Sequence, residues 1–373
     1  MVKRVMMIAG EASGDLHGAG VVRELKKADP SIDVFGVGGD QMKREGMTVV
    51  YHVRELGFMG FVEVVKHLPF IKVMEYTLGQ IVKFKKPDVL VLIDYPGFNL
   101  RFARKVKHYG MKIVYYISPQ IWAWHASRVR KIKELVDKML VVFPFEVPLY
   151  EKEGVPVDFV GHPLLEVLDT QFDRKNFCKR YGIDASKKIL ALIPGSRRQE
   201  IERIFPVMLQ AARRVAAEME MEVVIAVAPT LDQQYFAAMH NLEGIHLVQG
   251  ATYDVMAHSA FAMVTSGTAT LETACFGTPM MVVYKTSWPT YIIGRALVQI
   301  HSIGLVNIVA GKKIVPEFIQ HRATPSALAK EAMGILRSED RLSTMRNDLR
   351  AIREKLGSPG ASRRVANLIL QMA

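Results

Sequence analysis

The sequence predicts two doubly wound α/β domains, each built on a parallel sheet with helices on both faces. Short runs rich in Val, Ile and Leu alternate with helix-like segments along most of the 373 residues. These runs are apolar throughout rather than alternating, as expected for strands buried on both faces. They fall into two series separated by a polar stretch, residues 169–188. The chain is long enough to form two cores, so a domain for each series is expected, with a cleft between the domains.

The strands follow in order along the chain. The first series is Arg4–Ala9, Asp33–Val37, Val89–Ile93, Lys112–Tyr116, Lys138–Val142 and Asp158–Val160. The second series is Ile189–Ile193, Glu222–Ala228, Ile245–Val248, Phe261–Val264 and Met280–Val283. We therefore expect an N-terminal domain over residues 1–165 and a C-terminal domain over 166–350. Residues 351–373 are expected to form a last helix that packs back on the N-terminal domain.

Composition narrows the class of protein. The net charge of +12 favours a nucleic acid, an anionic membrane or a phosphorylated substrate as partner. The two cysteines, Cys178 and Cys275, exclude a disulfide framework and a four-cysteine metal site. The sequence shows neither a secretory signal nor a membrane-spanning apolar stretch. We therefore expect a cytoplasmic protein, or one on the cytoplasmic face of a membrane.

Two stretches of the first domain have an unusual composition. No acidic residue lies between Asp94 and Glu134. This interval holds two tryptophans, Trp122 and Trp124, and several Lys and Arg residues, among them Arg128, Arg130 and Lys131. It is either a solvated helix face or a surface for phosphate or anionic lipid. The segment Glu55–Tyr76 is rich in apolar residues, including Phe58, Met59, Phe61 and Val64. It is either an amphipathic segment that lies in a membrane interface or a pair of core-packing helices.

Polar residues follow the strands of the first domain, where ligands of such sheets bind. The first strand leads into AGEASGDLHGAG, which lacks the G-x-G-x-x-G spacing of a dinucleotide site. A nicotinamide or flavin enzyme is therefore disfavoured. Glu11, Ser13 and Asp15 lie in this turn, and helix capping is the alternative role for the last two. Asp94 ends a buried strand, where a carboxylate can act as a general base or simply form the turn.

The second domain contains two turns suited to an anion. Gly195 and Ser196 stand between a strand and a helix, where backbone N–H groups bind anions. Arg197 and Arg198 add fixed positive charge, and arginine can bind phosphate through two hydrogen bonds. Ser266, Gly267 and Thr268 form a second such turn, followed by Glu272. Two such helix starts in one domain argue for a diphosphate, and a carboxylate beside them suits the hydroxyls of a sugar. The predicted ligand is a nucleotide diphosphate that carries a further group.

The sequence contains no indication of a metal or a cofactor. No Asp-x-Asp pair of the kind that holds a divalent ion in many sugar transferases is present. The histidines form no convincing ligand cluster. Helix N-termini and arginine are therefore expected to stabilise the leaving diphosphate without a metal.

These motifs resemble those of the lipid-A-disaccharide synthases, inverting glycosyltransferases of the GT-B fold. The resemblance covers nearly the whole chain and rests on AGEASGDLHGA, LGFMGFVEVVKHLP, LIDYPGFN, YYISPQIWAW followed by RVRKIK, FPFE, GHPL, PGSR and SGTATLE. It implies the condensation of UDP-2,3-diacylglucosamine with 2,3-diacylglucosamine 1-phosphate (lipid X) into a β-1,6-linked disaccharide, with release of UDP. It also implies a metal-independent enzyme without cofactor, attached peripherally to the cytoplasmic face of the inner membrane. A homodimer is compatible with the sequence, which does not define the oligomeric state.

The resemblance also implies roles for single residues. Ser13 would line the cleft with Glu11 and Asp15, Ser196 and Arg197 would contact the diphosphate, Glu272 the ribose, and Asn307 the nucleotide. Asp94 matches the first acid of the family's Asp-x-Pro-x-Phe-Asn turn, in which Gly97 replaces a second Asp of some members. The candidates for the base are Asp94, Glu11 and Asp88. Asp94 is preferred because it stands at the cleft end of its strand, whereas Asp88 begins that strand.

Two other classes of protein remain as alternatives. A soluble UDP-N-acetylglucosamine 2-epimerase has the same two-domain pattern, but it handles no lipid and should lack both unusual stretches. A nucleic-acid-binding protein is suggested by charge alone, and no recognisable binding motif accompanies that charge.

Overall fold

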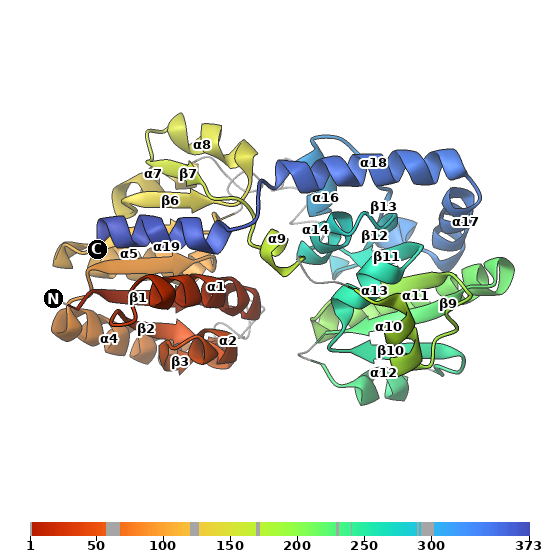
Figure 1. The fold of residues 1–373 in the computed structure, drawn as a ribbon, viewed down its shortest axis with the longest axis horizontal. Helices are drawn as coiled ribbons and strands as arrows, with labels where there is room; N and C mark the ends of the chain where they lie inside the picture. Colours follow the sequence, from red (N-terminus) through yellow and green to blue (C-terminus); the bar gives the residue numbers. More distant parts are fainter. Residues whose placement is uncertain are drawn as a thin grey trace. The chain divides into compact units, whose positions relative to one another are not determined.

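The computed structural model describes residues 2–56, 68–119, 127–168, 172–228, 231–239, 241–288, 291 and 302–373. The chain divides into two compact units, unit 1 (Met1–Glu166 with Leu356–Ala373) and unit 2 (Val167–Lys355). The chain enters unit 2 after Glu166 and returns to unit 1 after Lys355 (Figure 1). Residues 351–355 thus belong to unit 2 rather than to the last helix.

Unit 1 contains a parallel sheet with the order β3-β2-β1-β4-β5-β6-β7. Its strands are β1 (Arg4–Ala9), β2 (Asp33–Gly38), β3 (Thr48–His52), β4 (Val89–Ile93), β5 (Lys112–Tyr116), β6 (Lys138–Val141) and β7 (Val157–Phe159). Its helices are α1 (Ala12–Ala28), α2 (Asp40–Arg44), α4 (Leu68–Lys85), α5 (Pro96–Val106), α7 (Ser127–Leu135), α8 (Val147–Glu151), α9 (Leu164–Val167) and α19 (Ala361–Met372). Short 3₁₀ turns cover Val53–Leu56, Lys107–Tyr109 and Pro144–Glu146.

Unit 2 repeats this plan with the strand order β10-β9-β8-β11-β12-β13, again all parallel. Its strands are β8 (Ile189–Ile193), β9 (Glu222–Val227), β10 (Ile245–Gln249), β11 (Phe261–Thr265), β12 (Met280–Tyr284) and β13 (Glu317–Ile319). Its helices are α10 (Arg174–Tyr181), α11 (Arg198–Met219), α12 (Gln233–Met239), α13 (Thr252–His258), α14 (Thr268–Cys275), α16 (Leu305–Ala310), α17 (Pro325–Leu336) and α18 (Glu339–Lys355). A 3₁₀ turn covers Gln320–Arg322.

The predicted fold class is confirmed, and each predicted strand is present. Two strands, β3 and β13, were not predicted, and both lie at a sheet edge. Every residue of β3 is at least partly exposed, and β13 has only three residues. An edge strand lacks the continuous apolar run by which a doubly buried strand is recognised, so these two strands carried little signal.

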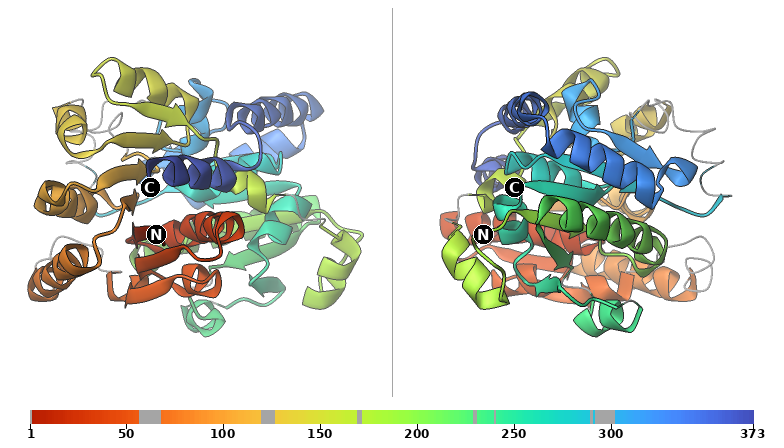
Figure 2. Two further views of the ribbon diagram at one scale, coloured as in Figure 1. Left: turned by 60° about the vertical axis from the view of Figure 1, so that its left-hand side comes forward. Right: turned by 90° about the vertical axis from the view of Figure 1, so that its right-hand side faces the viewer.

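The core of unit 1 lies between its sheet and helices on both faces. Met6, Leu90 and Tyr115 point to one face, where they pack in a cluster with residues of α4, α5 and α7. On the other face α19 lies beside α1, next to β5. Lys3 Nζ donates a hydrogen bond to the Leu370 carbonyl, so the two ends of the chain lie close together (Figure 2).

The order of strands identifies one binding position in each sheet. The direction of strand succession reverses between β1 and β4 in unit 1 and between β8 and β11 in unit 2. Ligands of doubly wound sheets bind beyond the carboxyl ends of the strands at such a reversal. The four turns that follow these strands carry AGEASGD, DYPGFN, PGSR and SGTATLE. The motifs found in the sequence are therefore those that the topology brings to the reversal points.

Candidate active site

In unit 1 the turns after β1 and β4 lie side by side, because the two strands pair up to Ala9 and Ile93. Gly10 follows β1 directly, and Tyr95 is the second residue after β4. A Cβ atom added to Gly10 would lie 2.1 Å from Cγ of the Tyr95 ring. Only glycine therefore leaves room for the Tyr95 ring, and the two turns form one packed unit.

The carboxyl group of Asp94 has a raised pKa. Burial raises the pKa of Asp94 from 3.8 to about 6, and the negative charge of Glu11 adds to this shift. A hydrogen bond from the Tyr95 backbone N–H opposes it. A carboxylate with a pKa near neutrality is a better proton acceptor than an ordinary aspartate and is still ionised at pH 7. This pKa suits a general base.

The other acidic residues of unit 1 have different environments. Glu11 is half-buried at the N-cap of α1 and acts on Asp94 through its charge. Asp15 is buried, and its carboxylate accepts hydrogen bonds from the backbone N–H groups of Gly39, Gln41 and Met42, at 2.7–3.1 Å. It therefore holds the start of α2 and offers its charge to the backbone, not to a ligand. Ser13 is exposed on α1, close to the turn.

Asp88 corrects one expectation from the sequence. It precedes β4, and its carboxylate accepts a hydrogen bond of 2.7 Å from the Arg4 backbone N–H at the start of β1. This contact lies at the amino edge of the sheet, whereas Asp94 follows the carboxyl end of the same strand. Asp88 is therefore not a candidate for the base, which leaves Asp94 and Glu11.

In unit 2 the turns after β8 and β11 are neighbours in the same way, since Ile193 pairs with Val264. Gly195 has φ = +101°, and a Cβ atom there would lie 2.9 Å from Thr265 Cγ2. Gly267, with φ = +141°, is the N-cap of α14. Both conformations favour glycine, so these residues allow the backbone of the two turns to approach closely.

Two helices begin at these turns without a capping side chain. The N-cap of α11 is Arg197, whose guanidinium cannot accept a hydrogen bond, and that of α14 is Gly267, which has no side chain. The N–H groups of a first helical turn have no partner within the helix and attract anions. Thr268, the first residue of α14, is exposed. The Ser266 hydroxyl donates to the Ile303 carbonyl at 2.8 Å and thereby fixes the second turn.

The two arginines after β8 differ in their surroundings. Arg197 is half-exposed, and its guanidinium lies 3.1 Å from Glu200 Oε1. The Arg198 guanidinium lies over the Tyr235 ring, 5.2 Å from its centre. Arg197 also acts electrostatically on Tyr284 at the end of β12. It is therefore Arg197 that supplies charge near the carboxyl end of the sheet, while Arg198 packs against α12.

Glu272 on α14 is held by a tyrosine. The Tyr253 hydroxyl donates a hydrogen bond to Glu272 Oε1 at 3.2 Å. Burial raises the pKa of Glu272, and the hydrogen bond from Tyr253 opposes this shift. A carboxylate fixed in this way can accept hydrogen bonds from sugar hydroxyls without reorganising. Sequence reasoning missed Tyr253, which lies on a different helix and belongs to no recognised motif.

Asn307 also corrects an expectation. Its side chain is only 2% exposed. The amide nitrogen donates to the Val315 carbonyl and to Glu317 Oε1, and the amide oxygen accepts from the N–H groups of Ile314 and Val315. All hydrogen-bonding groups of the side chain thus hold the loop before β13. The Asn307 side chain therefore has no hydrogen-bonding group left for a nucleotide and holds this loop instead.

Most residues predicted to contact a membrane lie outside the described residues. These are Phe58, Met59, Phe61, Val64, Trp122 and Trp124. Arg128 belongs to α7, whose Arg130 and Lys131 side chains are exposed. On the described part of α4, Val73, Tyr76 and Phe84 are 60%, 62% and 74% exposed. Phe84 lies beyond the predicted apolar segment Glu55–Tyr76.

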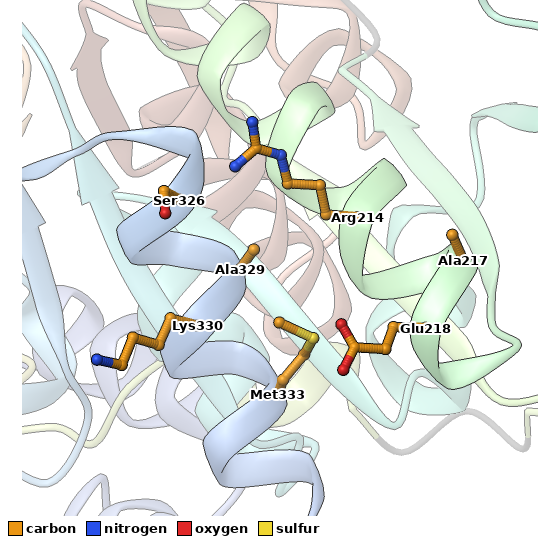
Figure 3. Close-up of a pocket in the computed structure, with 7 residues that line it drawn as sticks. All are labelled: Arg214, Ala217, Glu218, Ser326, Ala329, Lys330 and Met333. Carbon is orange, nitrogen blue, oxygen red and sulfur yellow. The ribbon is translucent and has the colours of Figure 1, made fainter.

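A cavity of about 540 Å³ lies elsewhere on unit 2, between α11 and α17. Arg214, Ala217, Glu218, Ser326, Ala329, Lys330 and Met333 line it (Figure 3). Glu218 pairs with Arg337. These residues of α11 are distant from its N-terminus, so the cavity is separate from the candidate site.

Within the described ranges, no group of three His, Cys, Asp or Glu residues could hold a metal ion. In the same ranges, no helix is long and apolar enough to cross a membrane.

Solved structures of low sequence identity share this fold. The UDP-GlcNAc 2-epimerase from Neisseria meningitidis bound to UDP-GlcNAc matches with a TM-score of 0.67 and 16% identity, over 99% of this chain and 100% of that one. The calicheamicin glycosyltransferase CalG4 matches with a TM-score of 0.65 and 16% identity, over 100% and 98% of the two chains. Because epimerases and glycosyltransferases both match, this likeness shows the two-domain fold alone.

Comparison of sequences is more specific. The family model described as lipid-A-disaccharide synthetase matches residues 5–372. The lipid-A-disaccharide synthase of Syntrophus aciditrophicus is 44% identical, over 99% of this chain and 98% of that protein. The enzyme of the same name from Geobacter metallireducens is 43% identical, over 99% and 97%. Since the family model and both relatives match nearly from end to end, the chain belongs to the lipid-A-disaccharide synthase family.

Proposed function

We propose that the chain joins UDP-2,3-diacylglucosamine to 2,3-diacylglucosamine 1-phosphate (lipid X), giving the β-1,6-linked disaccharide 1-phosphate and UDP. The observation that carries this assignment is the match to lipid-A-disaccharide synthases over nearly the whole chain. The proposed mechanism starts from the partly buried Asp94 carboxyl at the strand reversal of unit 1. Burial and the charge of Glu11 raise its pKa to about 6. A sugar hydroxyl is a poor nucleophile unless a base removes its proton as it attacks, and Asp94 has the properties of such a base.

Unit 2 supplies the groups for UDP in this proposal. The N-termini of α11 and α14 and the Arg197 guanidinium bind the diphosphate, while Glu272 accepts hydrogen bonds from the ribose. Preorganised donors of this kind stabilise negative charge as it develops on a leaving group. Arginine can grip a phosphate through two parallel hydrogen bonds. The leaving group is therefore neutralised by the protein, with no metal ion required.

The reaction is a single displacement. The 6-hydroxyl oxygen of lipid X forms a bond to the anomeric carbon from the face opposite UDP, and Asp94 accepts the hydroxyl proton. The bond between that carbon and the diphosphate oxygen breaks, and its electron pair leaves with UDP. One displacement inverts the anomeric centre from α to β. Positioning of the two sugars supplies a further part of the acceleration.

The first prediction concerns the reaction and its independence of metal. Purified protein should release UDP from UDP-2,3-diacylglucosamine only when lipid X is present, and excess EDTA in metal-free buffer should leave the rate unchanged. The product should carry a β linkage by NMR. Loss of activity with EDTA and recovery with Mg²⁺ or Mn²⁺ would contradict the role given to Arg197 and the helix N-termini. Epimerisation of UDP-N-acetylglucosamine is the control reaction and should be absent.

Both substrates carry acyl chains, so we propose that unit 1 docks on the cytoplasmic face of the inner membrane. The basic side chains of α7 attract anionic lipid, with about 1 kcal/mol from each Lys or Arg near the surface. The exposed Val73, Tyr76 and Phe84 of α4 add apolar contact. Arg130 is 82% exposed and lies 3.7 Å from Glu153. An exposed pair of this kind holds its partners weakly, so Arg130 remains available to lipid.

The second prediction tests this docking with vesicles that contain anionic lipid. Binding should fall as salt screens the charges, without vanishing, because the apolar contact is insensitive to screening. The test variant replaces four basic residues of α7 by Gln: Arg128, Arg130, Lys131 and Lys133. The control variant makes the same change in charge on unit 2, at Lys175, Lys179, Arg180 and Lys188.

Only the α7 variant should sediment less with vesicles, and both variants should bind UDP as the parent does. Equal sedimentation of the α7 variant and the parent at every salt concentration would show that α7 is a solvated face. The membrane contact would then rest on apolar residues alone.

A further inference from the structure

The backbone of the turn after β4 has an unusual conformation. Asp94 and Tyr95 have φ values of +46° and +47°. This left-handed region is unfavourable for residues other than glycine, and two such residues in succession persist only where their surroundings enforce them. Strain of this kind gathers at functional sites. Some neighbouring group must therefore hold the Asp94 backbone in place.

The hydrogen bonds around Asp94 show which groups do so. The Asp94 carbonyl oxygen accepts a hydrogen bond of 2.5 Å from the Tyr115 hydroxyl and one of 2.7 Å from Asn99 Nδ2. The same Asn99 nitrogen lies 3.2 Å from the Ile93 carbonyl oxygen. The Asp94 N–H donates to the Tyr116 carbonyl at 3.0 Å. The peptide groups on both sides of the Asp94 Cα atom are thus fixed.

Tyr115 is the rigid part of this arrangement. It lies on β5, the neighbour of β4, and its side chain is fully buried in the core that also contains residues of α4 and α5. A ring packed in this way has little freedom to move, so its hydroxyl defines a point in space for the Asp94 carbonyl. Asn99 belongs to the same helix start as the turn itself and would move with it.

We propose that the Tyr115 hydroxyl is the positioning group of the active site, holding the strained Asp94 turn so that the carboxylate faces the acceptor hydroxyl. This inference rests on the proposed role of Asp94 as base. Tyr115 acts without touching substrate. Its effect on the reaction passes through the backbone of Asp94, and a displacement of about 1 Å in a catalytic group can cost roughly 100-fold in rate.

The next residue on the strand provides a matched control. Tyr116 is also fully buried, but successive side chains of a strand point to opposite faces. Its hydroxyl has no hydrogen-bond partner among the described residues. Tyr115→Phe and Tyr116→Phe therefore remove the same atom from adjacent, equally buried positions, and only the first removes a contact to Asp94.

The test is steady-state kinetics of both variants over a range of pH. Tyr115→Phe should lower kcat by roughly 10- to 100-fold with little change in the KM for the UDP-sugar. The groups that act on the Asp94 carboxyl are Glu11, whose charge raises its pKa, and the Tyr95 backbone N–H, which lowers it. Release of the turn should expose that carboxyl to water, so its pKa should fall and the acidic limb of the rate profile should move to lower pH. Tyr116→Phe should match the parent in all three measurements.

The outcomes separate this inference from the proposed function. If Tyr115→Phe keeps the parent kcat and pH profile while Asp94→Asn is inactive, the positioning role is wrong and the base remains. If Asp94→Asn is as active as the parent, the proposed base itself fails. Equal impairment of Tyr115→Phe and Tyr116→Phe would show a general effect on the core and would also overturn the inference. Both tyrosines lie in unit 1, so the unfolding temperature of each variant, compared with the parent, shows whether the mutated unit is folded.

Discussion

Asp94→Asn should lower kcat by roughly 10²- to 10⁴-fold, the usual contribution of a general base. Asparagine preserves the shape of the side chain but accepts no proton from the acceptor hydroxyl. The parent enzyme should lose activity as pH falls through about 6, because the Asp94 carboxyl becomes protonated there. The residual activity of the variant should lack this acidic limb. The rate of UDP release from UDP-2,3-diacylglucosamine and lipid X should be measured for the parent and the variant between about pH 5 and 8. This range includes the pH near which the rate of the parent should fall.

The same variant should not be less stable than the parent at neutral pH. The pKa of Asp94 rises from 3.8 to about 6 in the folded protein. The folded state therefore binds the proton more tightly than the unfolded state, and stability falls as pH rises through this interval. Above pH 6 the buried charge costs about 1–3 kcal/mol, which asparagine avoids. If Asp94→Asn is inactive but its unfolding temperature equals or exceeds that of the parent, the loss of activity has a chemical cause and not a structural one.

Glu11 provides the control for this prediction. It is the other acidic residue near the turn, and its charge contributes to the raised pKa of Asp94. Glu11→Gln should shift the acidic limb to lower pH and leave substantial activity. If Glu11→Gln were inactive and Asp94→Asn active, the base would be Glu11.

The fold was predictable because its strands are buried on both faces. In a chain with alternating helical segments, a short apolar run such as Ile189–Ile193 is most simply a strand of a buried parallel sheet. The edge strand β3 was not predictable in this way, since all its residues are at least partly exposed. The positions of the binding turns followed from the strands, because each motif directly succeeds an apolar run.

The contacts of individual side chains were less predictable, because they depend on partners distant in sequence. Asp15 was expected to line the cleft, but it binds backbone N–H groups of residues 39–42. Arg197 and Arg198 are adjacent and chemically identical, yet only Arg198 lies over Tyr235. The hydroxyl of Tyr115 reaches the Asp94 carbonyl from the neighbouring strand. Nothing in the local sequence distinguishes these residues from their neighbours.

The difference between the two arginines makes the last prediction specific. Arg197→Ala should lower kcat by roughly 10²- to 10³-fold, because one preorganised donor to a developing negative charge has about this effect. The bond to the diphosphate is charge-assisted, and such bonds contribute about 1.5–3 kcal/mol. UDP should also bind more weakly, since part of this contact already exists before the reaction.

Arg198→Ala is the matched control. It removes the same side chain and the same charge one residue further along, where the guanidinium packs on Tyr235. It should retain nearly the parent kcat and UDP affinity. Arg197→Lys should lie between the parent and Arg197→Ala, because an ammonium keeps the charge but lacks the planar fork that matches two phosphate oxygens.

The unfolding temperature of Arg197→Ala should show that its lower kcat does not result from damage to α11. The pair between Arg197 and Glu200 is half-exposed on the arginine side, and such pairs contribute about 0–1 kcal/mol. Arg197→Ala should therefore unfold at nearly the parent temperature while its turnover and its affinity for UDP, measured by calorimetry, are reduced. Near-normal turnover in Arg197→Ala would remove this residue from the stabilisation of the leaving group. Equal losses in Arg197→Ala and Arg198→Ala would point instead to the start of α11 as a whole, and the diphosphate would then be held by backbone N–H groups.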